Sequence, residues 1–220
     1  MKKFSIVLKI LKKNSRSFAT TTLSEIAEER DPFKVLISCL LSLRTRDETT
    51  ARVSKKLYEL ANNSKDMAKL NEKVIARVIK SVNYYKTKAK RIKAISKLLV
   101  EKFDGKVPDD LDTLLTFKGV GRKTANIVIV YGFNKQGIPV DTHVHRVSNR
   151  LGWVDTKSPE KTEAALRSLL PKRYWMDIND LFVKFGQNIC RPINPKCYSC
   201  PIKKYCKYYK NLATRQIKVK

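Results

Sequence analysis

The chain has 220 residues, enough for one large domain or two small ones, and its 42% hydrophobic and 30% charged content excludes a disordered protein. Its 47 lysine and arginine residues outnumber its 20 acidic residues. The resulting net charge of +27 favours a polyanionic partner, of which nucleic acid is the commonest. A lysine-rich solvated surface, as some thermophile proteins have, is the alternative explanation of this charge.

The apolar segments and the cysteines indicate the compartment. No apolar run approaches the length of a membrane span, and Lys9, Lys12 and Lys13 interrupt the segment near the N-terminus that faintly resembles a signal peptide. Four of the five cysteines lie close together near the C-terminus, which suits metal binding in a reducing compartment better than disulfide bonding. We therefore expect an intracellular protein.

The N-terminal part of the chain predicts a series of helices. A basic amphipathic helix is expected within residues 1–30. Asp31 and Pro32 then form an N-cap followed by proline at the first helical position. Residues 33–43 are apolar almost all round, which predicts a central buried helix with Cys39 as an inert core residue. Asp47 can cap the helix after it.

Further helices follow along the chain. Asn71 can cap one of them, and a turn is expected at residues 83–85, where Asn83 is the residue that tolerates a left-handed backbone. A long, very basic helix over residues 86–103 should end at Asp104-Gly105. Three more helices are expected, beginning near Asp141, near Ser158 and at Trp175. No segment has a convincing strand pattern, so the predicted fold is all-α.

A Gly-x-Gly turn, Gly119-Val120-Gly121, separates two apolar helical segments. Glycine can adopt a positive φ there, and it leaves backbone N–H groups uncovered at the N-terminus of the second helix, where an anion is favoured. Because Arg122 and Lys123 follow, we expect this anion to be phosphate. A nucleotide-binding P-loop does not fit, since Arg122 separates Gly121 from Lys123 and no β-type run precedes the glycines.

Four cysteines near the C-terminus have the spacing C-x6-C-x2-C-x5-C. They are Cys190, Cys197, Cys200 and Cys206. Four thiolates in so short a segment can hold a 4Fe–4S cluster or a tetrahedral zinc ion. Generic spacing does not separate these two occupants.

Three stretches together resemble the endonuclease III family of DNA glycosylase/lyases. Residues 115–126 are similar to the helix-hairpin-helix of that family, Val140-Asp141-Thr142-His143 matches a second motif, and the four-cysteine segment matches a third. The resemblance covers about residues 31–205. It implies a six-helix domain over residues 25–135 and a helical iron–sulfur domain formed by residues 1–24 and 136–220. It also implies a 4Fe–4S cluster, with zinc as the less favoured occupant.

The resemblance implies a bifunctional enzyme of base excision repair. Such an enzyme removes an oxidised or damaged pyrimidine and then cleaves the backbone 3′ to the abasic site by β-elimination. We expect a monomer that acts on double-stranded DNA containing a damaged base or an abasic site, in the cytoplasm or nucleoid of a prokaryote. A monofunctional mismatch glycosylase is the nearest alternative, but those relatives lack a lysine at position 123. A non-catalytic DNA-binding module is an alternative of a different class.

Two residues are the expected catalytic groups. Lys123 occupies the position of the family's nucleophilic lysine, whose amine attacks C1′ of the sugar and holds it as a Schiff base. From the hairpin alone, a simple phosphate contact would be the better explanation of Lys123. Asp141 aligns with the family's catalytic aspartate, which stabilises an oxocarbenium-like sugar and can relay protons. Asp141 also suits an N-cap, and the two roles are compatible.

The resemblance also implies DNA contacts. A damaged base must leave the duplex before it can react, and Arg44 and Tyr84 lie where the family places its gap-filling and wedging residues. Here they replace a glutamine and a leucine-like residue, and solvated surface side chains are the alternative for both. Lys118 departs from the proline that is usual at its position. The other expected contacts are Gly119, Gly121, Arg122, His143, Arg191 and Lys196, of which His143 is equally well explained as a structural histidine.

Overall fold

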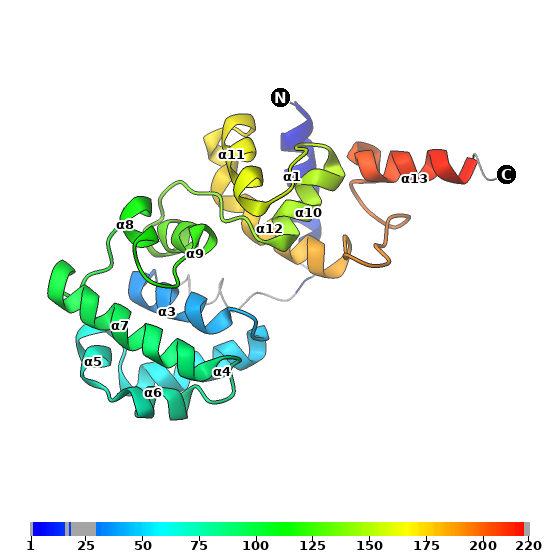
Figure 1. Ribbon diagram of the computed structural model, residues 1–220. Helices are drawn as coiled ribbons and strands as arrows, with labels where there is room; N and C mark the ends of the chain where they lie inside the picture. Colours follow the sequence, from blue (N-terminus) through cyan, green and yellow to red (C-terminus); the bar gives the residue numbers. More distant parts are fainter. Residues whose placement is uncertain (1, 16–17, 19–29, 218–220) are drawn as a thin grey trace. The chain divides into compact units, whose positions relative to one another are not determined.

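The structure is a computed structural model that describes residues 2–15, 18 and 30–217. The described residues form helices joined by loops, and no β-strand occurs among them (Figure 1). The predicted all-α fold is therefore confirmed. No helix in the described ranges combines the length and the hydrophobicity that a membrane crossing requires.

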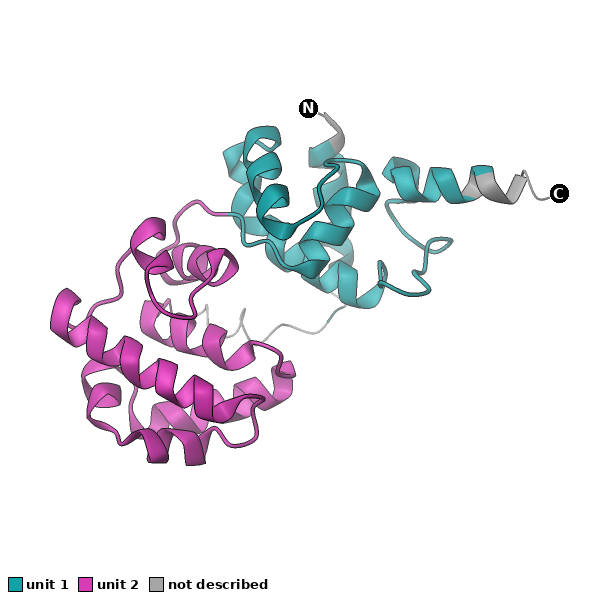
Figure 2. Ribbon diagram, viewed as in Figure 1, with its two compact units in different colours: residues 1–19, 138–220 teal, residues 20–137 magenta. Residues whose placement is uncertain are grey.

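The chain forms two compact units, each with its own hydrophobic core (Figure 2). Residues 20–137 form one unit, here called the hairpin unit, and residues 1–19 with 138–220 form the other, here called the cysteine unit. The boundary expected between residues 24 and 25 lies outside the described residues.

The hairpin unit is made of consecutive short helices and one long one. They are α3 (Pro32–Ser42), α4 (Asp47–Leu60), α5 (Ser64–Lys69), α6 (Glu72–Val78), α7 (Tyr85–Phe103), α8 (Leu111–Leu115), α9 (Arg122–Ile127) and the π-helix η1 (Val128–Gly132).

The cysteine unit joins the first helix to the C-terminal part of the chain. Its elements are α1 (Lys2–Ser15), α10 (Thr142–Leu151), α11 (Pro159–Leu169), the 3-10 helix η2 (Lys172–Tyr174), α12 (Trp175–Asn188), the 3-10 helix η3 (Lys203–Tyr205) and α13 (Lys207–Ile217).

Helix α3 lies at the centre of the hairpin unit, as its apolar sequence predicts. Eight of its residues are buried, and it packs against α4, α7, α9 and η1. Asp31 caps it by accepting hydrogen bonds from the N–H groups of Phe33 (2.9 Å) and Lys34 (3.1 Å), and Pro32 stands at the first helical position. A Cβ on Gly132 would lie 2.9 Å from the Cα of Pro32, so glycine allows η1 to approach α3 this closely.

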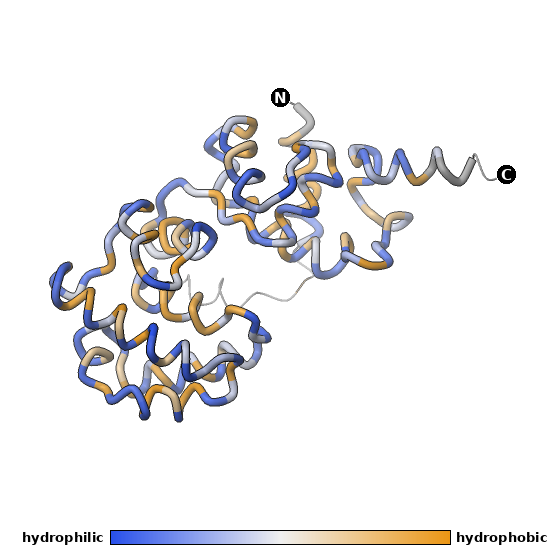
Figure 3. The backbone as a smooth tube through the Cα atoms, in the orientation of Figure 1, coloured by the Kyte–Doolittle hydropathy of each residue, from blue (hydrophilic) through white to orange (hydrophobic). Residues whose placement is uncertain are grey.

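Helix α7 packs against α5 and α6, and Figure 3 shows hydrophilic and hydrophobic residues alternating along it.

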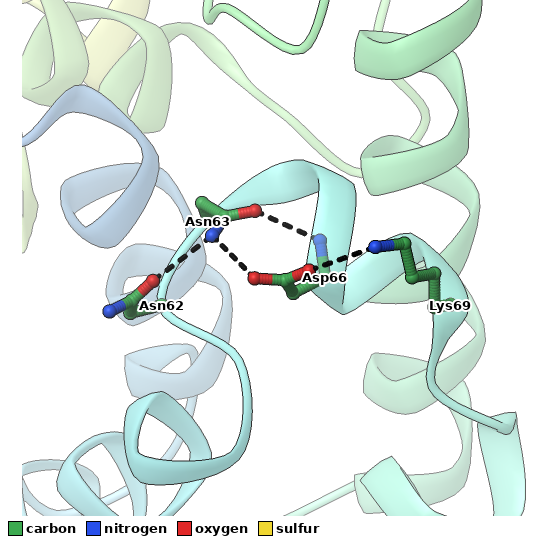
Figure 4. Close-up of polar contacts among 4 residues, drawn as sticks. All are labelled: Asn62, Asn63, Asp66 and Lys69. Atoms are coloured by element: carbon green, nitrogen blue, oxygen red, sulfur yellow. Dashed lines mark hydrogen bonds and ion pairs between the residues drawn. The ribbon is translucent and has the colours of Figure 1, made fainter.

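Side chains form hydrogen bonds at both ends of helix α5. At its start the Asn63 side chain accepts from the Asp66 N–H (2.9 Å) and donates to the Asp66 carboxylate (2.7 Å), which Lys69 also binds (Figure 4). At its end Lys93 of α7 donates to the carbonyl of Ala68 (2.5 Å). A short helix thus has partners for its unpaired ends.

The core of the cysteine unit lies mainly between α10 and α12, with α1 packed on α12. Trp153 stands between Phe4 of α1 and Phe182 of α12, with ring centroids 4.8 and 5.4 Å away. These aromatic contacts connect the N-terminal helix to the C-terminal part of the chain.

Two local predictions were wrong. Asp47 is the first residue of α4 and makes no cap, because the N-cap position belongs to Arg46, whose side chain forms no capping bond. In the turn before α7, the left-handed residue is Tyr84 (φ 57°) and not Asn83. The side chain of Asn83 instead donates to the backbone carbonyl of Arg44. The caps that we predicted at Asn71 and Asp141 are present, and Ser158, near which a helix was expected to begin, is the N-cap of α11.

Replacing Asp31 by alanine should destabilise the protein by about 1 kcal/mol, because the two N–H groups at the start of α3 would lose their acceptor. Asp31→Asn retains a side-chain oxygen and should cost only a few tenths of this. Urea unfolding of the two variants measures the difference. Equal losses would contradict a capping role for Asp31.

Candidate functional site

The Gly-x-Gly turn joins α8 to α9 as the sequence predicts. Gly119 has φ 92°, a backbone conformation that favours glycine, and Gly121 is the N-cap of α9 with no side-chain capping bond. Val120 between them is buried and fastens the turn to the core. Gly121, Arg122 and Lys123 are exposed. The turn therefore presents backbone N–H groups and two cationic side chains on one exposed segment, which suits a phosphate.

Arg91 on α7 is a cation beside this turn that the sequence did not reveal. A Cβ placed on Gly119 would lie 2.9 Å from Cδ and 3.0 Å from Nε of Arg91, so the arginine side chain covers this face of the glycine. Arg91 thus adds positive charge next to the turn. No sequence pattern connects it with the hairpin, because the contact joins residues 28 positions apart and depends on the tertiary fold.

Lys123 lies in the first turn of α9, the helix that packs on α3. Burial raises the pKa of the Cys39 thiol of α3 to about 12, and the positive charge of Lys123 acts on it in the opposite sense. Cys39 is thus a protonated core residue, as predicted. Lys123 is therefore an exposed residue on a helix that packs against the apolar helix α3.

Arg44 and Tyr84 are brought together by two turns of the hairpin unit. Arg44 (φ 55°) follows α3 and Tyr84 (φ 57°) precedes α7, so both are bulky residues with left-handed backbones. The Arg44 guanidinium donates to the Tyr84 hydroxyl (3.4 Å) and lies 5.9 Å from the centre of its ring. Both side chains are exposed, Tyr84 at 64%. Left-handed conformations of such residues cost roughly 1–2 kcal/mol each and are found preferentially at functional sites.

In the cysteine unit, Asp141 caps α10. Its carboxylate accepts hydrogen bonds from the N–H groups of His143 (2.9 Å) and Val144 (2.8 Å), which fixes its side chain at the start of the helix. His143 shares a hydrogen bond with Arg146 (3.0 Å). Arg146 also donates to the carbonyl of Cys190 (3.0 Å), so His143 is connected to the first cysteine.

A second arginine of α10 holds the loop between the first two cysteines. Arg150 donates to the carbonyls of Arg191 (2.7 Å) and Pro192 (3.0 Å) and to the Sγ of Cys190 (3.4 Å). Arg191 and Lys196 are exposed on this loop. We did not predict the bond from Arg146 to the Cys190 carbonyl or the bonds from Arg150 to this loop. Their spacing of four residues on a helix that begins at Asp141 is the signal that could have identified them.

All four clustered cysteines line one partly open cavity, together with apolar residues of α10 and α12 and with Arg150. Burial raises the pKa of Cys200 to about 11 and also raises the pKa of Cys197 and Cys206. These thiols therefore stay protonated at neutral pH unless a metal replaces the proton. Among the described residues, no group of three or more histidine, cysteine or acidic side chains is arranged to hold a metal ion.

Comparison with known proteins identifies several similar chains. Residues 37–172 match the HhH-GPD superfamily of base excision DNA repair proteins. The chain is 50% identical over 191 residues to Endonuclease III of Thermotoga maritima, across 87% of this chain and 90% of that protein. It is similar to a non-covalent endonuclease III–DNA complex, with a TM-score of 0.85, 32% identity and coverage of 97% of this chain and 98% of that one. A trapped endonuclease III–DNA covalent intermediate matches with a TM-score of 0.78 and 34% identity over 87% of this chain and 95% of that one.

Replacing Tyr84 by glycine should leave the protein as stable as before or stabilise it by up to about 1 kcal/mol, because glycine adopts φ 57° without strain. Lys90→Gly is the matched control at an exposed position inside α7, where the same change should cost about 0.7 kcal/mol. Thermal melting of both variants gives the comparison. A loss of stability in Tyr84→Gly as large as in Lys90→Gly would show that the turn at Tyr84 is not strained.

Proposed function

The chain belongs to the HhH-GPD superfamily of base excision DNA repair proteins, and we propose from this membership which of its residues perform the repair. It is a bifunctional DNA glycosylase of the endonuclease III type. It removes oxidised or damaged pyrimidines and cleaves the backbone 3′ to the abasic site by β-elimination through a lysine Schiff base. The observation that carries the residue assignment is the lysine that follows the Gly-x-Gly turn within a chain so similar to an endonuclease III.

Lys123 is the nucleophile. Its Nζ attacks C1′ of the damaged nucleotide, the bond from C1′ to the base breaks, and the base leaves with a proton. The sugar ring opens to give an iminium linkage between Nζ and C1′. Loss of a proton from C2′ then expels the 3′ phosphate, and water releases the lysine. Lys123 is exposed at the start of α9, so its amine is accessible to a sugar that has left the duplex.

Asp141 stabilises the positive charge that develops on the sugar. A carboxylate facing an oxocarbenium-like centre lowers the barrier electrostatically, and the same group can accept and return protons during the elimination. The two hydrogen bonds from the start of α10 hold its side chain in one orientation, so little reorganisation is needed when the charge appears. Capping and catalysis therefore use the same geometry.

Three segments bind the DNA backbone or fill the duplex. The Gly-x-Gly turn with Arg122 binds phosphate through N–H groups and charge, and Arg91 strengthens this contact. Arg44 and Tyr84 occupy the gap that the extruded nucleotide leaves and keep the neighbouring bases stacked. Arg191 and Lys196 contact phosphate from the loop that Arg150 holds, while His143 orients Arg146. The substrate is double-stranded DNA with a damaged base or an abasic site, bound by a single copy of the chain inside the cell.

Cys190, Cys197, Cys200 and Cys206 are the residues that would hold a 4Fe–4S cluster. Their four thiols line one shared cavity, which supports a sulfur-ligated group, and Arg150 supplies positive charge beside Cys190 for an anionic thiolate. A cluster bound there would have a structural role, because Cys190 and Cys197 stand at the two ends of the loop that carries Arg191 and Lys196. Arg146 and Arg150 hold the same loop to α10, the helix that begins at Asp141.

The variant Lys123→Gln should fold and bind DNA like the wild type, because the backbone groups of the turn are unchanged, yet it should form no covalent adduct. Borohydride reduces a Schiff base to a stable amine, so gel electrophoresis after treatment with abasic-site DNA detects the adduct. Wild type should be trapped and Lys123→Gln should not. An adduct of unchanged yield in Lys123→Gln would mean that another amine is the nucleophile.

Asp141→Asn should slow base removal about a hundredfold, because it removes the negative charge while asparagine continues to cap α10. Single-turnover kinetics on a duplex with one oxidised pyrimidine measures the rate, and thermal melting tests the fold. A slow variant with unchanged melting temperature separates catalysis from stability. If Asp141→Asn removed the base as fast as the wild type does, Asp141 would have only the capping role.

Purified protein should show the broad visible absorbance of an iron–sulfur group, with iron and sulfide bound. Cys200→Ser should lose both, since Cys200 lines the cavity. Cys39→Ala, which alters the cysteine buried in α3, is the matched control and should retain both. A colourless, folded wild type with one zinc per chain would overturn the cluster assignment.

A further inference from the structure

A buried lysine lies beneath the two turns that carry Arg44 and Tyr84. Lys88 of α7 is only 4% exposed, and its ammonium group donates to the carbonyls of Leu41 (2.6 Å) and Leu43 (2.7 Å) and to the hydroxyl of Thr45 (3.0 Å). These three acceptors belong to the end of α3 and the turn after it, on either side of Arg44. All three N–H donors of the lysine are thus directed at the segment that contains Arg44.

The same lysine is also connected to Tyr84. Its backbone N–H donates to the carbonyl of Tyr84 (3.0 Å), so Lys88 lies one helical turn after the residue that begins α7. Asn83 adds a second link between the two turns, from its side chain to the carbonyl of Arg44. The turn after α3 and the turn before α7 are therefore fastened to each other at two points.

We propose that Lys88 is a positioning residue for base extrusion: its ammonium group holds the turn after α3 so that Arg44 and Tyr84 stand together, ready to enter the duplex. This inference rests on the proposed function, in which Arg44 and Tyr84 fill the gap left by the extruded nucleotide. Lys88 is buried and does not itself touch DNA.

Physical chemistry supports this role over simple filling of the core. The last carbonyls of a helix have no partner within the helix and carry partial negative charge, so a cation with three donors is well matched to the end of α3. Arg44 and Tyr84 both keep a left-handed backbone that is unfavourable for their side chains. Such conformations persist where surrounding bonds determine them, and Lys88 and Asn83 supply these bonds.

Burial supports the same conclusion from another direction. It lowers the pKa of Lys88 to about 8, because the charged form is less well hydrated inside the protein. A lysine that served only to add surface charge would not be placed there, because a buried cation is unfavourable unless it is hydrogen-bonded. Its aliphatic part could be replaced by methionine at similar volume, whereas its three donors could not.

The chain offers a matched control in Lys93 of the same helix. Its ammonium group also reaches carbonyls at a helix end, those of Ala68 in the last turn of α5 and of Leu70, the C-cap of that helix. Lys93→Met therefore removes the same kind of contact from α7, but at a helix end that carries neither Arg44 nor Tyr84. Any effect common to both variants reflects loss of stability, and an effect confined to Lys88→Met reflects the two turns.

The test compares wild type, Lys88→Met and Lys93→Met on two substrates. The first is a duplex with one oxidised pyrimidine, which requires extrusion, and the second is a single strand with an abasic site, which does not. Lys88→Met should lower the single-turnover rate on the duplex about tenfold to a hundredfold, as expected when contact residues are misplaced. Borohydride trapping on the single strand should stay within about twofold of wild type. Lys93→Met should match wild type on both substrates.

A double-mutant cycle identifies the route of the effect. If Lys88 acts through the two turns, then adding Lys88→Met to an Arg44→Ala, Tyr84→Ala protein should change the duplex rate little, because the positioned side chains are already gone. Additive losses, or equal rates for Lys88→Met and Lys93→Met, would overturn the inference. Should Lys88→Met not fold, Thr45→Val removes one of the three acceptors and should lower the duplex rate in the same direction, while an unchanged rate would overturn it. A wild type that fails on both substrates would instead refute the proposed function.

Discussion

The unpaired backbone groups at the ends of helices are the constraint on which this structure depends. Every helix leaves N–H groups at its start and carbonyls at its end without partners inside the helix, and a fold made of short helices has many such ends. At several of the described helices, side chains supply these partners. Asp31, Asn63 and Asp141 accept from helix starts, Lys88 and Lys93 donate to helix ends, and Arg150 donates to the loop after α12.

Several of the residues that we propose to act on DNA also lie at helix ends. Gly121 is the N-cap of α9 and has no capping side chain, which suits the phosphate contact proposed for this turn. Asp141 is the N-cap of α10 and supplies the carboxylate proposed to act on the sugar. Arg44 follows α3 and Tyr84 precedes α7. Under the proposed function, the two helix starts suit different ligands: a glycine leaves donors exposed for a negative phosphate, and an aspartate presents negative charge to a positive sugar.

Much of the fold could be predicted because its signals are local. The caps at Asp31 and Asp141, the apolar sequence of α3 and the glycines of the hairpin are each defined within a few residues. The errors came where two local signals competed. Asp47 and Asn83 both suit the special positions assigned to them, but Arg46 and Tyr84 hold these positions. In the second case the Asn83 side chain is bonded to the carbonyl of Arg44, 39 positions away, which local sequence does not reveal. The catalytic and DNA-contact assignments depend on family resemblance and remain predictions.

The residues that sequence reasoning missed, Lys88, Arg91, Arg146 and Arg150, have a physical feature in common. Each is a cation on a helix with at least one partner 28 or more positions away in the chain, and the high content of 47 basic residues does not by itself distinguish these four. The high charge therefore conceals two different uses of lysine and arginine. Exposed cations such as Arg122 and Lys196 are suited to attract DNA over long distances in the proposed function. Lys88 is instead withdrawn from solvent and Arg146 is half-buried, and both donate to backbone carbonyls of loops or helix ends. Removing an exposed cation weakens attraction that salt also screens, but removing a withdrawn one leaves carbonyls without donors, which salt cannot compensate. The net charge of the chain is therefore larger than the positive charge available for binding DNA in the proposed function, since some of these cations form hydrogen bonds inside the protein.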